Sequence, residues 1–458
     1  MTRAAVVLAA GKGTRFRSEL AKVLHPIAGR PMVAWVLQAL RPLHLDRVVV
    51  VVGHQGDQVI AEAKAVEGLN VHAVHQAEQR GTGHAVRVAF ESGALDGVDQ
   101  LLVVPGDAPL LSRAPLAELF AAQPGNGVAL MSTTLDDPTG YGRIIRDSEG
   151  RVVRSVEERD ASPPQRAITE VNTSVYVFDA RLVAEHLTRL GTDNEQGEEY
   201  LTDVIELMAD AGIVAVSAPQ RSVGGVNDRE QLARAAAELR AEMLATLMRE
   251  GVTVVDPSAT YVDAGCVVEP DAVLLPGTYL EGNTTIRRGA VIGPNTRLVD
   301  TAVEAEATVT FTVAVSARIG PGAQVGPFCY LRPEARLEER AKAGAFVEVK
   351  QSVIGPGSKV PHLSYIGNTT IGEHSNIGAA TVTVNYDGRR KHHTTIGDRV
   401  RIGSDTMLIA PVKVGDDAYT GAGSVITRDV PAGALAIERT EQRNIEGYAA
   451  RRAARDES

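Results

Sequence analysis

Aliphatic side chains return at every sixth position through much of the last third of the chain. Six residues fit neither the helical period near 3.6 nor the alternation of one long strand. A period of six is typical of a parallel β-helix, in which each hexapeptide forms one short strand and one corner. Glycine follows many of these positions and gives the corners their backbone freedom. The series predicts a β-solenoid and consists of Val262, Val268, Leu274, Leu280, Ile286, Ile292, Leu298, Ile319, Val325, Leu331, Leu337, Ile354, Val360, Ile366, Ile371, Ile377, Ile396, Ile402, Leu408, Val414, Thr420 and Ile426.

The six-residue rhythm is not continuous. It breaks before Ile319, shifts slightly between Asn368 and Ile371, and is lost between Thr381 and Thr395. Insertions into a solenoid form surface loops, which often bind ligands. The basic run Arg389-Arg390-Lys391 in the last stretch is interpreted either as a solvated loop tip or as a phosphate contact.

The first 230 residues follow a different pattern. Continuous apolar runs, typical of strands buried on both faces, alternate with helical patterns. The runs are 4–9, 48–52, 101–104 and 127–131, and the helical patterns include Pro31 to Leu40 and Thr82 to Glu91. This alternation predicts an α/β domain with a mixed, mostly parallel, doubly wound sheet, whose ligands bind beyond the carboxyl ends of the strands.

One amphipathic helix is expected between the two patterns. Leu232, Leu239 and Leu247 lie at helical spacing, and Gly251 follows as a stop. We therefore expect a first domain at 1–227, a linker helix at 228–250 and a β-helix domain with a C-terminal tail at 251–458.

Composition narrows the classes of function. The net charge of −10 gives no electrostatic footprint for nucleic acid. Both cysteines, Cys266 and Cys329, lie inside the repeats, where we expect packing residues in a reducing compartment. No stretch reaches about 20 apolar residues, and the start of the sequence has no cleavage-site pattern. These features predict a cytoplasmic protein without a membrane span.

A glycine-rich loop follows the first apolar run directly. In Gly11-Lys12-Gly13-Thr14-Arg15-Phe16, backbone N–H groups can cradle phosphate oxygens. Arg15 and Lys22 can add cationic charge there. The loop matches neither the dinucleotide fingerprint nor the Walker A pattern, so a plain strand-to-helix turn is the alternative.

The string from Leu8 to Phe16, with Lys22, resembles the signature of the sugar-1-phosphate nucleotidyltransferases. Gln76 to Ala85 is similar to the uracil-binding loop of the branch that makes UDP-N-acetylglucosamine. The resemblance implies that Asp107 and Asn227 hold Mg²⁺, while Arg15 and Lys22 stabilise charge on UTP. The implied nucleotide and sugar contacts are Leu8, Ala9, Ala10, Gly11, Lys22, Gln76, Gly81, Thr82, Pro105, Gly106, Asp107, Gly142, Glu157, Asn172 and Asn227.

Several of these residues have simpler interpretations when taken alone. Asp107 can cap a helix, Asn227 can be a turn residue, and Glu157 can be one exposed charge among several. Pro105 departs from the family pattern, where an aromatic residue is frequent. The functional interpretation is favoured because these residues occur together, in the family's order and at similar separations.

Four strings inside the repeats resemble the acetyltransferase half of a family of bifunctional enzymes, whose activities are N-acetylglucosamine-1-phosphate uridyltransferase and glucosamine-1-phosphate N-acetyltransferase. They are Phe346 to Lys350, His362 to Tyr365, Asn376 to Ala379 and Asn385 to Gly388. The resemblance covers both halves of the chain in order, and it implies that the hexapeptide helix is left-handed.

Roles in acetyl transfer follow from this resemblance. His362 is implied as the general base, which suits the ordinary pKa of histidine. Pro361 and Ala380 depart from the pattern, which has glycine at both places. The implied substrate contacts are Arg332, Lys350, Tyr365, Asn376, Asn385 and Tyr386, and the implied acetyl-CoA contacts are Ala379, Ser404, Ala422 and Arg439.

The resulting hypothesis is a two-step enzyme with acetyl-CoA as co-substrate. Glucosamine-1-phosphate is acetylated and then uridylated from UTP, which feeds peptidoglycan and other cell-envelope polysaccharides. The resemblance also implies a homotrimer. Two alternatives stay open: a single-activity nucleotidyltransferase with a structural or regulatory β-helix, and a trimeric scaffold with inactive sites.

Overall fold

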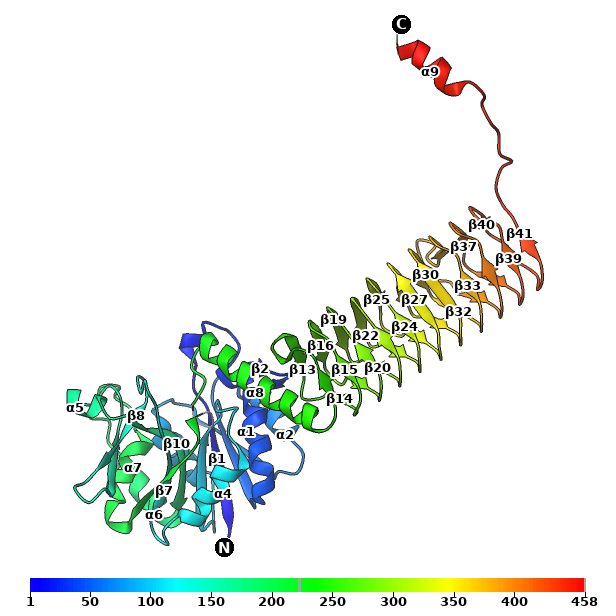
Figure 1. The fold of residues 1–458 in the computed structure, drawn as a ribbon. Helices are drawn as coiled ribbons and strands as arrows, with labels where there is room; N and C mark the ends of the chain where they lie inside the picture. Colours follow the sequence, from blue (N-terminus) through cyan, green and yellow to red (C-terminus); the bar gives the residue numbers. More distant parts are fainter. Residues whose placement is uncertain (221–223, 457–458) are drawn as a thin grey trace. The chain divides into compact units, whose positions relative to one another are not determined.

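The computed structural model describes residues 1–220 and 224–456. The chain forms two compact units, of which the first ends at Arg240 and the second begins at Ala241. The α/β pattern and the β-helix predicted from the sequence are both present (Figure 1). Within the described ranges, none of the helices has the length and apolar character needed to span a membrane.

The first unit is built on one mixed sheet. Its strands run in the order β11 (Ile213–Ser217), β7 (Val128–Thr134), β10 (Glu170–Asp179), β6 (Gln100–Pro105), β1 (Arg3–Ala9), β4 (Arg47–Val52) and β5 (Val71–His75), with β8 (Gly142–Arg146) and β9 (Val152–Val156) at the side of β10. β1 pairs in parallel with β4 and β6, whereas β10 is antiparallel to β6 and β7. Three of the continuous apolar runs form the adjacent strands β6, β1 and β4, and the fourth forms β7.

Helices cover both faces of this sheet. Alternate side chains of β1 point to opposite faces and pack against different helices. Ala5 and Val7 pack with residues of α1 (Met32–Leu40), α2 (Gly56–Lys64) and α4 (Arg113–Ala122). Ala4 and Val6 pack on the other side with α3 (Thr82–Glu91), α6 (Ala180–Leu187) and α7 (Leu201–Leu207). Shorter helical segments are η1 (Thr14–Phe16), η2 (Lys22–Leu24), η3 (Arg41–Leu43), α5 (Pro163–Arg166) and η4 (Ala209–Ala211), and β2 (Pro26–Ile27) pairs with β3 (Arg30–Pro31).

The expected linker helix is α8 (Arg229–Arg249). At its start, the Asp228 carboxylate accepts a hydrogen bond from the backbone N–H of Gln231 at 2.8 Å, which is the usual N-cap arrangement. Gly251 follows its end with φ of 99°, in the region that favours glycine. The boundary between the two compact units falls inside this helix.

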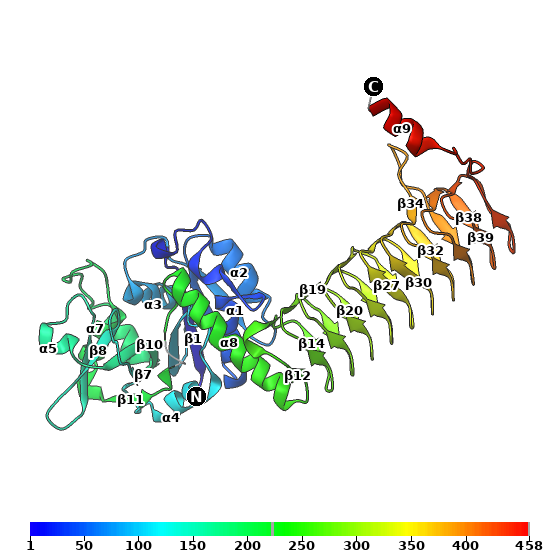
Figure 2. The same cartoon turned by 45° about the horizontal axis from the view of Figure 1, so that its top comes forward.

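The second unit is a three-faced parallel β-helix (Figures 1 and 2). Its first face contains β12 (Thr253–Val254), β15 (Val273–Leu274), β18 (Val291–Ile292), β21 (Thr308–Val309), β24 (Gln324–Val325), β27 (Lys342–Ala345), β30 (Lys359–His362), β33 (Asn376–Ile377), β36 (Arg401–Ile402), β39 (Tyr419–Thr420) and β41 (Leu435–Ala436). The second face contains β13 (Thr260–Val262), β16 (Thr278–Glu281), β19 (Thr296–Val299), β22 (Thr312–Val315), β25 (Cys329–Leu331), β28 (Glu348–Lys350), β31 (Tyr365–Gly367), β34 (Val382–Val384), β37 (Met407–Ile409) and β40 (Val425–Ile426). The third face contains β14 (Val267–Val268), β17 (Thr285–Ile286), β20 (Ala302–Val303), β23 (Arg318–Ile319), β26 (Arg336–Leu337), β29 (Val353–Ile354), β32 (Thr369–Ile371), β35 (Thr394–Ile396) and β38 (Val412–Val414).

The β-helix continues where the aliphatic series breaks. Val303, Val309 and Ala314 fill its interior between Leu298 and Ile319, and all three are fully buried. Val273 pairs with Val291 and Val291 with Thr308, so the second coil is one residue shorter than the first. A search for a strict period of six misses such coils.

The long interruption is a real insertion. It leaves the β-helix after β34 and returns at β35, and an isolated bridge joins Tyr386 to Lys391. At the start of the unit, the short helical segment η6 (Pro257–Ala259) lies between β12 and β13. Near the end of the chain, the helix α9 (Tyr448–Asp456) follows a segment without regular structure.

Candidate active sites

The glycine-rich loop leaves the carboxyl end of β1 and turns back into η1. Gly13 has φ of 60°, and a Cβ there would lie 2.6 Å from Lys22 Cβ, so the turn requires glycine. A Cβ on Gly11 would meet no atom within 4 Å. The backbone of the loop therefore faces open space on the side where a ligand can approach.

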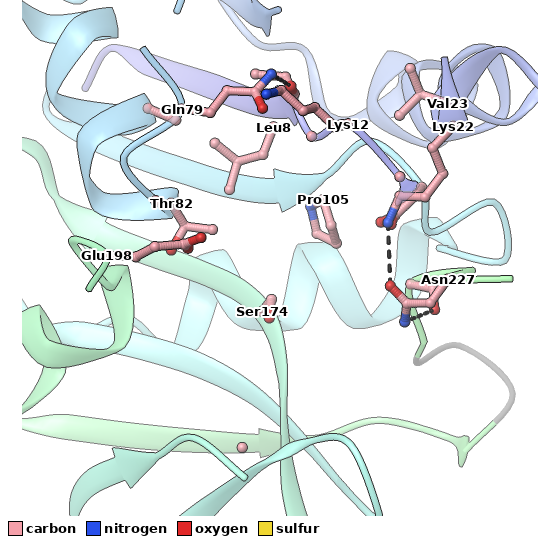
Figure 3. Close-up of a pocket in the computed structure, with 18 of the residues that line it drawn as sticks. Leu8, Lys12, Lys22, Val23, Gln79, Thr82, Pro105, Ser174, Glu198 and Asn227 are labelled. Atoms are coloured by element: carbon pink, nitrogen blue, oxygen red, sulfur yellow. Dashed lines mark hydrogen bonds and ion pairs between the residues drawn. The ribbon is translucent and has the colours of Figure 1, made fainter. Parts of the chain in front are cut away.

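Charged and amide groups from four segments meet beside this loop. Lys22 Nζ forms an ion pair with Asp107 Oδ2 and donates to Asn227 Oδ1 at 3.3 Å. Arg15 Nη2 donates to the same Asn227 oxygen at 2.9 Å. Figure 3 shows Lys22 and Asn227 together on one side of the cavity. The structure thus brings together the residues assigned to phosphate charge and metal binding.

Asp107 and Asn227 direct oxygen atoms toward one cation, the ammonium group of Lys22. A carboxylate and an amide oxygen that converge in this way suit a hard divalent cation, which keeps several waters and takes few protein ligands. Among the described residues there is no cluster of three or more His, Cys, Asp and Glu side chains placed to hold a metal. The donor set fits a metal that is bound mainly through substrate phosphates.

The loop after β5 supplies another wall of the cavity. Gln76 Nε2 donates to the carbonyl oxygen of Gly81 at 3.1 Å, and Thr82 Oγ1 accepts from the backbone N–H of Leu201 at 3.1 Å. Gln79 Nε2 donates to the carbonyl oxygen of Ala10 at 2.6 Å, which ties this loop to the glycine-rich loop.

Polar groups on β8, β9 and β10 line the opposite side. Asn172 Nδ2 donates to Ser155 Oγ at 3.0 Å and to Tyr176 Oη at 2.7 Å. Burial raises the pKa of Glu157, and a hydrogen bond from Thr202 opposes that shift. Burial, and then the negative charge of Asp107, raise the pKa of Tyr141.

These walls enclose a cavity of about 590 Å³. Predicted residues that line it are Leu8, Ala10, Gly11, Lys22, Gln76, Gly81, Thr82, Pro105, Asp107, Gly142, Glu157, Asn172 and Asn227. Ala9, Arg15 and Gly106 do not line it directly; Gly106 packs on β1, where a Cβ would lie 3.0 Å from the Leu8 carbonyl oxygen. Lys12, Gln79, Ser174 and Glu198 line the cavity without having been predicted as ligand contacts (Figure 3).

The second group of predicted residues lies on the β-helix, around the corner between its first and second faces. Arg332 Nη1 donates to Glu348 Oε1 at 2.9 Å on the second face. Lys350, in the next coil, lies close to Lys391 of the insertion, and this contact lowers the pKa of Lys350. Two ammonium groups held together in this way favour a bound anion.

The insertion is held in shape by Asp387. Its carboxylate accepts from the backbone N–H of Arg390, from the His392 ring and from the backbone N–H of Arg389, in that order of effect, and these bonds lower the pKa of Asp387. Asn385 Nδ2 lies 3.5 Å from Tyr365 Oη, at the base of the insertion. The structure therefore brings Asn385 and Tyr365 together.

The remaining predicted residues lie in successive coils along the corner between the first and second faces. His362 is exposed at the end of β30, and its carbonyl oxygen accepts from the backbone N–H of Ala380 at 3.4 Å. In the next coils, the Ala379 carbonyl accepts from Asp405, and the Ser404 carbonyl accepts from Gly423. Arg439 Nη1 donates to the carbonyl oxygen of Ala422 at 3.0 Å. Ala379, Ser404, Ala422 and Arg439 thus form one continuous track that leads away from His362.

The predicted acetyl-transfer residues do not all share one face of a single chain. Asn376 lies on the first face, in register with Lys359 and Arg401. Lys350 and Tyr365 lie on the second face, beyond the corner at Leu363. Tyr386 is exposed on the insertion, where its hydroxyl donates to the carbonyl oxygen of Gly388 at 2.8 Å.

Fold and sites together define a nucleotidyltransferase joined to a hexapeptide-repeat transferase. Residues 5–206 match the MobA-like NTP transferase domain. Residues 393–428 match the bacterial transferase hexapeptide family, which has six repeats. The parallel three-faced β-helix with these repeats is left-handed, as predicted, and the predicted fold class is confirmed.

Relatives of known name match nearly the whole chain. The protein named "Bifunctional protein GlmU" of Streptomyces avermitilis is 52% identical over 98% of this chain and 94% of its own length. Proteins of the same name from Kineococcus radiotolerans and Corynebacterium jeikeium are 51% and 48% identical, over 97% and 98% of this chain and 91% and 93% of their own lengths. The chain belongs to the bifunctional GlmU family and is a transferase with two activities.

Proposed function

We propose that the two sites catalyse successive steps of UDP-N-acetylglucosamine synthesis. The β-helix acetylates glucosamine-1-phosphate from acetyl-CoA, and the α/β unit then uridylates the product from UTP. The observation that carries this proposal is the grouping of residues far apart in sequence: Lys22, Asp107 and Asn227 meet in one unit, and Ala379, Ser404, Ala422 and Arg439 align beside His362 in the other.

In the uridyl-transfer step, a phosphate oxygen of N-acetylglucosamine-1-phosphate attacks the α-phosphorus of UTP. The bond to the β-phosphate breaks, and pyrophosphate leaves. Lys22 and Arg15 stabilise the negative charge that develops around the phosphorus. Gln76, Gly81 and Thr82 hold the nucleotide, while Glu157 and Asn172 hold the N-acetyl sugar, so that the reacting atoms are aligned.

Asp107 and Asn227 would hold a Mg²⁺ ion in this site. The ion would supply charge neutralisation to the phosphate oxygens. The Lys22 ammonium group now contacts both proposed metal ligands, so the ion would replace it there. We propose that Lys22 turns to the phosphates when Asp107 and Asn227 bind the ion.

In the acetyl-transfer step, the amine nitrogen of glucosamine-1-phosphate attacks the thioester carbonyl carbon of acetyl-CoA. His362 takes the proton that the amine loses, the carbon–sulfur bond breaks, and the thiol of CoA leaves with a proton. Arg332 and Lys350 bind the sugar phosphate. The corner track binds acetyl-CoA, whose thioester thereby reaches His362.

We further propose that three chains assemble along the corner that carries His362. Phe311, Phe328, Phe346 and Leu363 form an exposed apolar ridge there, and successive ring centroids are 5.4 and 5.1 Å apart. An exposed apolar stripe of this kind marks an interaction surface. A second copy on this ridge would bring its own first face, with Asn376, toward the Lys350 and Tyr365 of its neighbour and complete the acetyl site.

Light scattering tests this assembly. The protein is expected to have three times the mass of one chain, and the double variant F328D/F346D is expected to be monomeric. The monomer should lose acetyl transfer and keep uridyl transfer. Val267→Asp, at an equally exposed apolar position on the third face, is the matched control and should remain trimeric. A trimeric F328D/F346D variant would contradict the proposed interface.

Product analysis tests the two-step function. With glucosamine-1-phosphate, acetyl-CoA, UTP and Mg²⁺, the protein is expected to release CoA and form UDP-N-acetylglucosamine. N-acetylglucosamine-1-phosphate should accumulate when UTP is withheld. A single-activity nucleotidyltransferase would release no CoA from acetyl-CoA under either condition, and an inactive scaffold would form no product at all.

A further inference from the structure

Two acceptors hold the side-chain amide of Gln76 in one orientation. Gln76 Nε2 lies 3.1 Å from the carbonyl oxygen of Gly81 and 2.9 Å from His84 Nδ1. A carbonyl oxygen only accepts, so the amide nitrogen, not the amide oxygen, must face Gly81. The same nitrogen must then donate to His84, whose Nδ1 therefore carries no proton.

The oxygen of this amide is left for a ligand. Both N–H bonds of Gln76 Nε2 are used inside the protein, and Oε1 has no hydrogen-bond partner in the described part of the chain. Gln76 lines the cavity and is only 5% exposed. Gln76 therefore presents a hydrogen-bond acceptor, and no donor, to a ligand in the cavity.

Glu199 bonds the residues on both sides of Gly81 and so holds the segment that carries the Gly81 carbonyl. Glu199 N–H donates to the Arg80 carbonyl oxygen at 2.7 Å, and Gly83 N–H donates to the Glu199 carbonyl oxygen at 2.8 Å. The Glu199 carboxylate accepts two bonds from Arg87, at 2.9 and 2.6 Å, and pairs with Arg80 at 2.6 Å. Gly81 has φ of 113°, and a Cβ there would lie 2.5 Å from the Glu199 carbonyl oxygen.

We propose that His84 is a positioning residue that sets the nucleobase selectivity of the uridyltransferase. By accepting from Gln76 Nε2, His84 keeps Gln76 Oε1 turned toward the base. Uracil presents an imide N3–H, which donates to that oxygen, whereas cytosine presents an unprotonated N3, which repels it. This inference rests on the proposed nucleotide site, and it applies equally to thymine, which has the same imide group.

Removal of His84 should loosen this control. In His84→Leu, one N–H of the buried Gln76 amide loses its acceptor, which is costly for a buried donor. A turned amide would instead set its oxygen against the Gly81 carbonyl. Neither state presents Oε1 to the base as firmly, so the advantage of uracil over cytosine shrinks.

The test compares kcat/KM for UTP and CTP, each with N-acetylglucosamine-1-phosphate. In His84→Leu, the ratio of UTP to CTP is expected to fall by about tenfold, the usual effect of one lost discriminating hydrogen bond. His84→Asn places an acceptor oxygen near the position of Nδ1 and should restore the wild-type ratio. Partial unfolding cannot produce this result, because it lowers both activities equally.

Two controls separate the possible outcomes. His186→Leu removes an equally buried histidine on α6, away from the cavity, and should leave the ratio unchanged. Gln76→Leu should lower the ratio by itself. If Gln76→Leu lowers it and His84→Leu does not, the role of His84 is overturned while the nucleotide site stands. If Gln76→Leu changes neither the ratio nor kcat/KM, the proposed base site is itself wrong.

Discussion

Asp107→Ala is expected to lower kcat for uridyl transfer by at least about a thousandfold, because it removes a charged group on which the proposed metal depends. The same change deprives Lys22 of its ion-pair partner at the floor of the cavity. Without this carboxylate, the Lys22 ammonium group keeps only its hydrogen bond to Asn227 Oδ1 beside the phosphate site. The measurement is pyrophosphate release from UTP and N-acetylglucosamine-1-phosphate at saturating Mg²⁺.

Acetyl transfer by this variant should be unchanged, since Asp107 belongs to the α/β unit and the acetyl-transfer residues belong to the β-helix. Asp137→Ala is the matched control, because Asp137 is an exposed carboxylate outside the cavity, and this variant should keep both activities. Wild-type uridyl transfer by Asp107→Ala would refute the proposed role.

His362→Ala is expected to produce the opposite result. Loss of a general base lowers a rate by about 10² to 10⁴-fold, so CoA release from acetyl-CoA and glucosamine-1-phosphate should fall by that factor. His362 is exposed and contributes only its backbone to the hydrogen bonds of the corner. The β-helix should therefore fold normally, and uridyl transfer should persist.

His374→Ala provides the control for this variant. His374 is likewise exposed at a corner of the β-helix, but on a different edge, beside Gly357. It should keep full acetyl transfer. If His362→Ala loses both activities, the histidine has a structural role, and the general base must be sought elsewhere.

Much of the fold could be predicted because apolar residues mark both the buried strands of the sheet and the six-residue repeat of the β-helix. The run from Ala4 to Ala9 became the central strand β1, and Val262 to Leu298 became successive interior positions of the β-helix. The coil around Ala314 could not be found in this way. There the interior position is a small residue and the step is five residues, so both signals of a hexapeptide are lost.

The candidate sites were predicted to the extent that their residues lie in recognisable strings. Lys22, Asp107 and Asn227 were assigned to one site from such strings, and the structure places them in contact. Glu198 and Ser174 have no such signal, because each reaches the cavity from a segment whose local pattern is ordinary. Only the packing of that segment against the cavity reveals them.

The departures from the family pattern have distinct structural consequences. Pro105 ends β6 and lines the cavity without an aromatic ring. Ala380 adopts φ of 59°, a conformation that favours glycine, at the coil next to His362. In this conformation, the backbone N–H of Ala380 still donates to the His362 carbonyl oxygen.

Mixing the two inactive variants tests most directly whether one chain carries two separate sites. Each variant alone, given glucosamine-1-phosphate, acetyl-CoA, UTP and Mg²⁺, should form almost no UDP-N-acetylglucosamine. An equal mixture of Asp107→Ala and His362→Ala should form it steadily, because the intermediate released by one protein is used by the other. A mixture that stays inactive, or a His362→Ala protein that makes the nucleotide sugar unaided, would contradict the account.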